Sequence, residues 1–295
     1  MPAYRTFQDG QGRPIKLYDN DGRLFVSHRT VVNWHDVTAM TSRDDDVLLC
    51  GYPKSGSHWL WEIVTMLKKG RAELAKDHME TSGFLMVSTA SQLENLPSPR
   101  VLTTHRHFQE LPSDFILKRR KIVCILRDPK DVCVSYYHML TTIKALEYDG
   151  TFEGFLSLFL EGHVPLNSWA SWVLSYEKGL KEHPDLSAHV VVYEQLKANP
   201  VGTIRRLADY LNINVTQGLV EAVAAQTHFS NMKPFKDNSS PPLTGLYKAN
   251  KVKDISLFRK GEQGQWRQWF TPEQAARFDR HIHKQLGRRS LQAKL

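Results

Sequence analysis

A strand, a loop and a helix are predicted in succession by residues 47–67, VLLCGYPKSGSHWLWEIVTML, and no other stretch constrains the fold as strongly. Val47–Leu49 form a short apolar run, which is typical of a buried strand. Residues 52–57 are rich in turn formers. Beyond them, apolar residues recur at the spacing of one helical face: Leu60, Ile63, Val64 and Leu67. A loop that opens a helix points several backbone N–H groups at one spot. Together with Lys54, these donors predict a P-loop-like site for a phosphate-like anion.

Further apolar runs predict short strands that end on polar residues: Arg100–His105, Lys121–Arg127 and Ala188–Glu194. A capping side chain followed by proline marks the expected start of a helix at each of these pairs: Asp128-Pro129, Asn199-Pro200 and Thr271-Pro272. Strands that alternate with helices indicate a parallel sheet, and ligands gather at the carboxyl ends of such strands. We therefore expect a single α/β domain over residues 1–295, with a central parallel β-sheet flanked by helices and a core from about residue 45 to 285.

The segments outside the predicted sheet carry weaker patterns. Residues 1–44 form an N-terminal segment in which we expect a hairpin. Its strands and turn lie at Ile15–Tyr18, Leu24–Val26 and Asp21-Gly22. Residues 227–256 are polar and basic, contain several prolines and show little periodicity. A long irregular stretch inside a compact domain is typical of a functional loop, so we expect residues 230–256 to form a lid.

The charge balance favours an anionic partner, because the net charge is +8, from 39 basic and 31 acidic residues. The densest basic cluster, Lys118–Lys121, could simply be a solvated strand entry, so the charge pattern does not predict nucleic-acid binding. The three cysteines lie beside apolar runs without metal-ligand spacing, which indicates buried reduced thiols: Cys50, Cys124 and Cys133. The first residues lack the apolar core of a signal peptide, and no apolar run reaches the length of a membrane span. We expect no metal and no membrane association.

The residues alone leave three functional classes open. The loop departs from the nucleoside-triphosphate signature G-x-x-x-x-G-K-[ST], because Lys54 precedes Gly56. The strands ending at Arg127 and at Tyr193-Glu194 also offer no clear acidic residue for magnesium. A P-loop nucleotide or small-molecule kinase is therefore the second choice, behind an enzyme that binds phosphate through cations and backbone alone. A basic, non-enzymatic binder of adenosine phosphates or nucleic acid is the third class.

Several motifs together resemble the cytosolic sulfotransferases. Residues 52–59, YPKSGSHW, are similar to that family's YPKSGTTW loop, and Thr104-His105 matches the end of its K-T-H strand. Residues 127–138, RDPKDVCVSYYH, match its R-N-x-K-D-x-x-V-S-Y-Y-H block. The remaining pieces follow in the family's order and spacing: Tyr193-Glu194, Thr227-x-Phe229 and FRKGEQGQW at 258–266. The likeness covers about residues 45–285, nearly the whole chain.

The resemblance implies a cytoplasmic enzyme that moves a sulfuryl group from 3′-phosphoadenosine 5′-phosphosulfate (PAPS) to a small acceptor, leaving adenosine 3′,5′-bisphosphate (PAP). It assigns His105 as the general base and Lys54 to the leaving oxygen. It also implies the following cofactor-binding residues: Lys54, Ser55, Gly56, Ser57, His58, Trp59, Arg127, Ser135, Tyr193, Thr227, Phe229, Phe258, Arg259, Lys260 and Gly261. Two separated phosphates require two anion sites. The strand that ends at Arg127 and the helix predicted after Asp128-Pro129, which contains Ser135, supply a cation and a hydroxyl donor for one of them.

Four departures from the family pattern affect what the resemblance implies. His58 replaces a threonine of the loop, and Thr103 replaces the lysine of K-T-H. Arg106-His107 replaces the usual Leu-Pro, which makes His107 a rival base to His105. The family's C-terminal dimer motif is degenerate, so we expect either a monomer or a homodimer. The residues at its positions are Arg267, Thr271, Pro272 and Ala276.

The acceptor is the least determined partner. Apolar residues near the expected site could line a pocket for a phenol or steroid, or could belong to the core: Phe84, Leu85, Met86, Phe152, Phe155 and Phe159. From this set and the RDPKDVCVSYYH block we select Phe84 and His138 as candidate substrate contacts. Aliphatic alcohols and amines remain alternative acceptors.

Overall fold

Two β-sheets and the helices around them make up the part of the chain that the computed structural model describes, residues 2–28, 31, 34, 36–77, 79, 82–237 and 261–287. The strands are β1 (Ala3–Gln8), β2 (Pro14–Asn20), β3 (Arg23–Phe25), β4 (Val47–Gly51), β5 (Val101–Thr104), β6 (Lys121–Leu126) and β7 (Ala188–Val192). The α-helices are α2 (Ser57–Lys69), α3 (Ala90–Glu94), α4 (Ser113–Leu117), α5 (Pro129–Leu140), α6 (Phe152–Glu161), α7 (Trp169–Glu182), α8 (Tyr193–Ala198), α9 (Pro200–Tyr210), α10 (Gln217–Gln226), α11 (Phe229–Asp237) and α12 (Pro272–Leu286). Short 3-10 helices span Val37–Ala39, Phe108–Glu110, Lys144–Leu146 and Gln265–Gln268.

The larger sheet is four-stranded and wholly parallel, in the order β5-β4-β6-β7. This confirms the predicted central parallel sheet. Strand β5 ends at Thr104, so His105 lies one residue beyond it rather than inside it. Tyr193 was expected inside the last strand but instead begins helix α8 directly after β7. The carboxyl ends of β4, β5 and β6 therefore lead directly into the loop at 52–56, His105 and Arg127.

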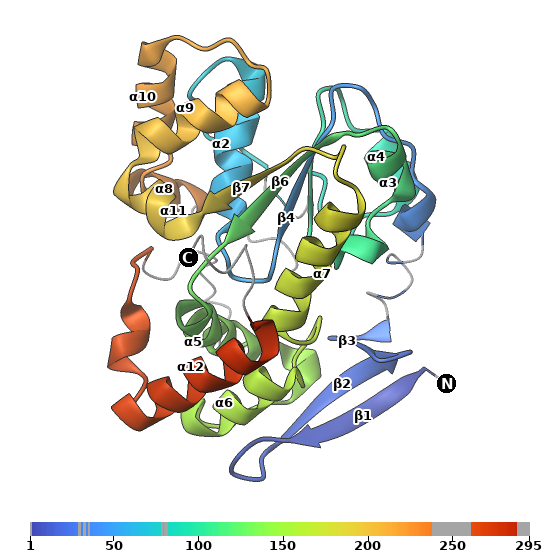
Figure 1. Ribbon diagram of the computed structural model, residues 1–295, viewed down its shortest axis with the longest axis vertical. Helices are drawn as coiled ribbons and strands as arrows, with labels where there is room; N and C mark the ends of the chain where they lie inside the picture. The colour runs from blue at the N-terminus through green and yellow to red at the C-terminus, as the bar shows by residue number, and fades with distance from the viewer. Residues whose placement is uncertain are drawn as a thin grey trace.

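Side chains on alternate sides of the sheet enter two separate apolar cores. In β4, Leu48 and Cys50 belong to one core, whereas Val47 and Leu49 belong to the other. The first core is completed by α5, α6, α7 and α12, and the second by α2, α9 and α10, so helices cover both faces of the sheet (Figure 1). The cysteines are buried and unbridged, as the sequence predicts: Cys50, Cys124 and Cys133.

The N-terminal strands form a separate antiparallel sheet in the order β1-β2-β3 (Figure 1). The expected hairpin is present as β2 and β3, with Asp21-Gly22 between them. Strand β1, which we did not predict, pairs with β2 along its whole length. The turn between β1 and β2 is fixed by Asp9, whose Oδ1 accepts hydrogen bonds from two backbone N–H groups and whose Oδ2 accepts one from Tyr148 Oη at 2.8 Å.

Helix α11 corrects the expectation of an irregular segment beginning near residue 227. Residues Phe229–Asp237 are helical even though Pro234 lies inside the helix. The helix is held by Lys236, whose Nζ lies 2.5 Å from Glu62 Oε1 of helix α2. Long-range burial therefore stabilises a helix that local propensity does not predict. The rest of the expected lid, residues 238–256, lies outside the described residues.

Candidate active site

The loop between β4 and α2 has a backbone shape that only particular residues allow. Gly56 precedes the helix with φ 107° in the left-handed region, and Lys54 has φ 70°. A Cβ atom at Gly56 would come within 2.9 Å of the Tyr193 ring, so a side chain would be both strained and crowded there. The glycine therefore lets the loop lie against Tyr193 while the helix begins at Ser57.

The loop and the first turn of helix α2 carry several buried hydrogen-bond donors, which are the best structural indication of an anion site. Ser55 Oγ, Ser57 Oγ and Trp59 Nε1 are buried and have no hydrogen-bond partner within the described part of the chain. Unsatisfied buried donors cost free energy, and such groups therefore suggest a ligand with several acceptor oxygens. The start of helix α2 adds backbone N–H groups to the same place.

Arg127 joins this loop to the strand next to it. Its Nη1 donates to Lys54 O at 3.1 Å and its Nη2 to Glu262 O at 3.2 Å. The guanidinium carbon lies 4.3 Å from the centre of the Tyr193 ring, and that ring meets Trp59 edge-to-face at 5.4 Å. Nε of Arg127 is buried without a partner among the described residues. The structure thus brings four predicted cofactor residues together: Lys54, Trp59, Arg127 and Tyr193.

His105 contacts the last residue of strand β4, which leads into the phosphate loop. Its Nδ1 lies 2.5 Å from Gly51 O, at the end of β4. Because a carbonyl oxygen only accepts, Nδ1 is the donor, so in the neutral imidazole the lone pair lies on Nε2. Phe84 packs edge-to-face on the imidazole with a centroid distance of 5.1 Å. The carbonyl contact therefore fixes both the orientation of His105 and a tautomer suited to accepting a proton at Nε2.

The remaining predicted cofactor residues lie on several elements. Phe229, at the start of α11, lies against Gly261, because a Cβ there would come within 2.1 Å of the phenylalanine ring. Thr227 is buried and its hydroxyl donates to Val223 O at 2.8 Å within the preceding helix. Ser135 and His58 are both half-buried, on α5 and α2 respectively. Phe258, Arg259 and Lys260 lie outside the described residues.

Some of the residues proposed to bind the acceptor substrate lie in the apolar core, and one lies beside His105. Three phenylalanines of helix α6 are buried in the apolar core, which favours the core alternative for them: Phe152, Phe155 and Phe159. Phe84 instead contacts His105, as described above. His138 meets Trp269 edge-to-face at 4.7 Å on the α12 side of helix α5. Of this group, Phe84 is the residue that the structure brings to the catalytic histidine candidate.

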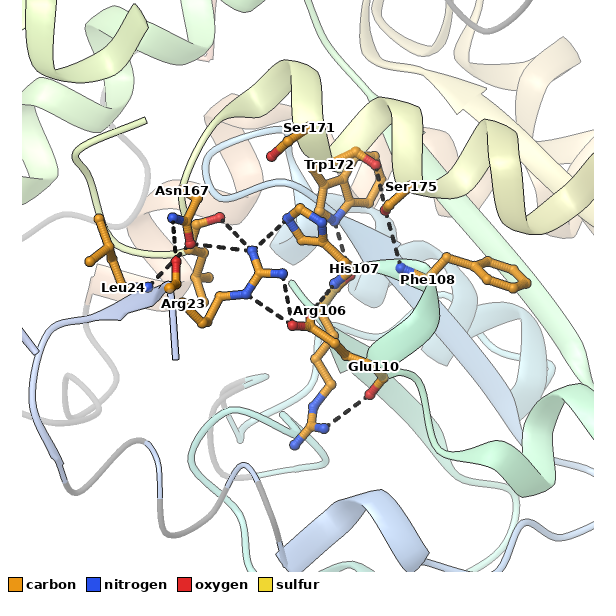
Figure 2. A network of polar contacts seen from close by, with 12 residues as sticks. Arg23, Leu24, Arg106, His107, Phe108, Glu110, Asn167, Ser171, Trp172 and Ser175 are labelled. Carbon is orange, nitrogen blue, oxygen red and sulfur yellow. Dashed lines mark hydrogen bonds and ion pairs between the residues drawn. The ribbon is translucent and has the colours of Figure 1, made fainter. Parts of the chain in front are cut away.

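The rival histidine, His107, is held in a polar network. Its Nε2 lies 2.8 Å from Arg23 Nη1, which can only donate, so Nε2 is the acceptor (Figure 2). Burial, together with the positive charge of Arg23, lowers the pKa of His107 to about 3. His107 is therefore neutral at physiological pH, but its lone pair is already engaged by Arg23.

This low pKa predicts how stability depends on pH. The pKa of His107 is about 3 in the folded protein against the ordinary value of 6.5, so the unfolded chain binds more protons between these values. Stability should therefore fall on acidification through this window, by about 1 kcal/mol per pH unit from this group. Urea unfolding at about pH 7, 6 and 5 should show a shallower pH slope for His107→Leu than for the wild type. Parallel slopes would contradict the assignment.

The basic cluster at the entry of β6 is engaged in local ion pairs. Lys118 lies 2.8 Å from Asp114, Arg119 2.5 Å from Asp185 and Arg120 2.6 Å from Asp44. These pairs support the interpretation of the cluster as a solvated strand entry. Among the described residues, no group of three or more histidine, cysteine or acidic side chains is arranged to hold a metal ion. No described helix has the length and hydropathy needed to span a bilayer.

Comparison with known proteins decides the family. The model of the sulfotransferase domain family matches residues 44–290. The chain belongs to this family. Sulfotransferase 1B1 of the dog, Canis lupus familiaris, is 33% identical over 272 residues, which cover 88% of this chain and 90% of that protein. The crystal structure of mouse sulfotransferase SULT7A1 complexed with PAP has a TM-score of 0.74 at 28% identity, covering 93% of this chain and 96% of that one.

Two further polar residues of this sulfotransferase make contacts near the predicted site residues but were not selected from the sequence. Asp131 is buried on α5, and its carboxylate accepts Gly264 N at 2.6 Å and Trp266 N at 2.9 Å. It therefore ties the segment after Gly261 to the helix that carries Ser135. The signal was present, since Asp131 is part of the matched RDPKDVCVSYYH block. Arg23 had no such signal, because it lies before the residues that the family model matches.

Proposed function

We propose that this sulfotransferase moves the sulfuryl group of PAPS to a hydroxyl or amine of a small, apolar acceptor such as a phenol or steroid, with His105 as general base and Lys54 at the leaving oxygen. The observation that carries the proposal is the contact between His105 Nδ1 and Gly51 O. It couples the proposed base to the strand that opens the phosphate loop. The buried, unpartnered donors of that loop support PAPS as the donor substrate, as do Arg127 over the Tyr193 ring and Trp59 edge-to-face against that ring.

The proposed reaction is an in-line displacement at sulfur. The acceptor oxygen forms a bond to sulfur while its proton passes to His105 Nε2. The bond between sulfur and the bridging oxygen breaks, and PAP leaves with the bonding electrons. Lys54, half-buried at the loop, would neutralise the charge that develops on that oxygen. Positioning and charge stabilisation are the main demands of such group transfer.

Thermal denaturation with ligands tests the cofactor against the kinase alternative. A ligand that binds only the folded state raises the melting temperature, by an amount equivalent to about 2.7 kcal/mol at 100 times Kd. We expect PAP to raise the melting temperature at micromolar concentration and magnesium-ATP to have little effect. Stabilisation by magnesium-ATP but not by PAP would favour a P-loop kinase. Binding of PAP without any turnover would favour the non-enzymatic binder.

Gly56→Ala tests whether PAP binding depends on the backbone conformation of the loop. A methyl group would lie 2.9 Å from the Tyr193 ring on a backbone with φ 107°, so we expect destabilisation of about 1–3 kcal/mol and weaker PAP binding. Gly218→Ala is the matched control, since its Cβ would meet nothing within 4 Å and it lies in helix α10. That change should stabilise by about 0.4–1 kcal/mol. Calorimetric titration with PAP measures both variants, and equal affinities would contradict the prediction.

A cytoplasmic location and a monomeric or homodimeric state belong to the same proposal, as does the treatment of residues 1–295 as one domain. At the degenerate dimer motif, Thr271 and Pro272 serve to start helix α12. The Thr271 hydroxyl accepts Gln274 N at 3.2 Å and the Gln274 side chain accepts Thr271 N at 3.0 Å. The buried, unbridged cysteines are compatible with a reducing compartment.

A further inference from the structure

Arg23, the first residue of β3, has a guanidinium that joins three segments distant in the sequence (Figure 2). Its Nη1 lies 2.8 Å from His107 Nε2 and 3.3 Å from Asn167 Oδ1. Its Nη2 and Nε lie 2.7 Å and 2.9 Å from Glu110 Oε1. The side chain is only 20% exposed, so these contacts are partly shielded from water. A planar fork of donors is needed to satisfy all of them at once.

The first branch of contacts leads to His105. Glu110, which Arg23 holds through Oε1, accepts the backbone N–H of His107 at 2.8 Å through Oε2. Arg23 therefore fixes both the ring and the backbone of His107, two residues beyond the proposed base. Proline, the family's usual residue at this position, has neither an imidazole acceptor nor a backbone N–H. This branch consequently depends on the histidine at position 107.

The second branch leads to the phosphate loop. Leu166 and Asn167 both adopt left-handed backbone conformations, with φ 65° and 63°, although neither is glycine. This conformation is costly for a leucine and easier for an asparagine, so Leu166 in particular needs contacts that hold it. Asn167 Oδ1 accepts Leu24 N at 3.1 Å in addition to Arg23, and Leu166 N donates to Leu24 O at 2.7 Å. Asn167 O in turn accepts the hydroxyl of Tyr52 at 2.7 Å.

The two branches meet at the site. Tyr52 follows Gly51, whose carbonyl oxygen lies 2.5 Å from His105 Nδ1. Arg23 thus contacts His107, which is close in sequence to the donor His105, and Asn167, which binds the residue after the acceptor Gly51. We propose that Arg23 is a positioning residue for sulfuryl transfer, which acts through His107 and Asn167 to hold His105 and the start of the phosphate loop in register. The inference rests on the proposed role of His105, and it makes the N-terminal sheet part of the catalytic framework.

Replacement of Arg23 by methionine tests the proposal, with Arg5→Met as the control on the same sheet. Arg5 pairs with Asp19 at 2.7 Å on the surface, where its side chain is 60% exposed. We expect Arg23→Met to lower kcat about 10–100-fold, because small misplacements of reacting groups have effects of this size. The loss in kcat should exceed the loss in PAP affinity, because the donors of the loop itself remain, and Arg5→Met should match the wild type. An unchanged kcat in Arg23→Met would overturn the proposal.

A pair of substitutions at His107 keeps the proposal testable if Arg23→Met does not fold. Glutamine can still offer Arg23 an acceptor oxygen, whereas leucine cannot. We expect His107→Gln to retain most of kcat and His107→Leu to lose it. In a foldable double variant, His107→Leu should add little to the loss from Arg23→Met, because the residues act as a unit. Equal kcat for the glutamine and leucine variants, or fully additive losses, would overturn the inference.

The inference can fail independently of the proposed function. Loss of turnover in His105→Ala with full kcat in Arg23→Met would leave the base assignment intact and remove only the positioning role. Full turnover in His105→Ala would overturn the proposed function itself, and the positioning role with it.

Discussion

Replacement of His105 by alanine is expected to lower kcat by about 10²–10⁴-fold, the usual contribution of a general base. The acceptor would lose the group that takes its proton, whereas the phosphate loop would keep its donors. PAP affinity should therefore stay close to that of the wild type. Steady-state kinetics at saturating PAPS, together with calorimetric titration of PAP, measure the two quantities separately.

His283→Ala is the matched control for this experiment, because that histidine is exposed on α12. Its kcat should equal that of the wild type. His105→Ala with full turnover would show that His105 is not the base. A parallel loss of PAP binding would show that His105 supports the loop rather than the chemistry.

Lys236→Met is expected to be strongly destabilising although it lies outside the reaction centre. Lys236 and Glu62 form an ion pair at 2.5 Å with side-chain exposures of 4% and 1%. Lys236 Nζ also donates to Ala75 O at 2.7 Å and to Asp77 O at 2.8 Å. Removing one member of such a pair leaves a buried charge uncompensated, at a cost of about 3–5 kcal/mol. Urea unfolding measures the loss.

Two further variants test whether the unpaired carboxylate of Glu62 causes the loss of stability in Lys236→Met. Lys233→Met removes a lysine from the same helix whose partner, Asp237, lies 2.6 Å away at the surface, and it should cost less than about 1 kcal/mol. Adding Glu62→Gln to Lys236→Met should recover part of the stability, because the buried carboxylate is then gone. Burial already raises the pKa of Glu62, so the single variant should also become less unstable on acidification. Equal losses for Lys236→Met and Lys233→Met would contradict the buried-pair interpretation.

The predictable parts of the fold are those whose signals are local. The Asp128, Asn199 and Thr271 caps each accept a hydrogen bond from the expected helical turn. Strand β1 escaped prediction because it is exposed on both faces and so lacks apolar alternation. Helix α11 escaped because Pro234 and polar residues conceal it, and its anchor, Glu62, is far away in the sequence.

The candidate site divides in the same way. Residues of the loop and of the strand ends could be placed from motif spacing, because parallel strands bring their carboxyl ends together. The partners of His107 could not be placed, since Arg23 is 84 residues away and Asn167 is 144 residues from Arg23. No sequence pattern predicts that Arg23 contacts His107 or Asn167. In the structure His107 accepts a hydrogen bond from Arg23. The motif alone already favours His105 over His107, and the structure adds the partners that engage His107.

PAPS-dependent turnover, measured over phenols, steroids, aliphatic alcohols and amines with donor labelled in the sulfate, tests the proposed reaction most directly. Labelled sulfuryl should pass to at least one apolar hydroxyl or amine acceptor, with one PAP released for each product formed. The rate should require His105. Binding of PAP without labelled product in any of the four acceptor classes would contradict the proposed reaction.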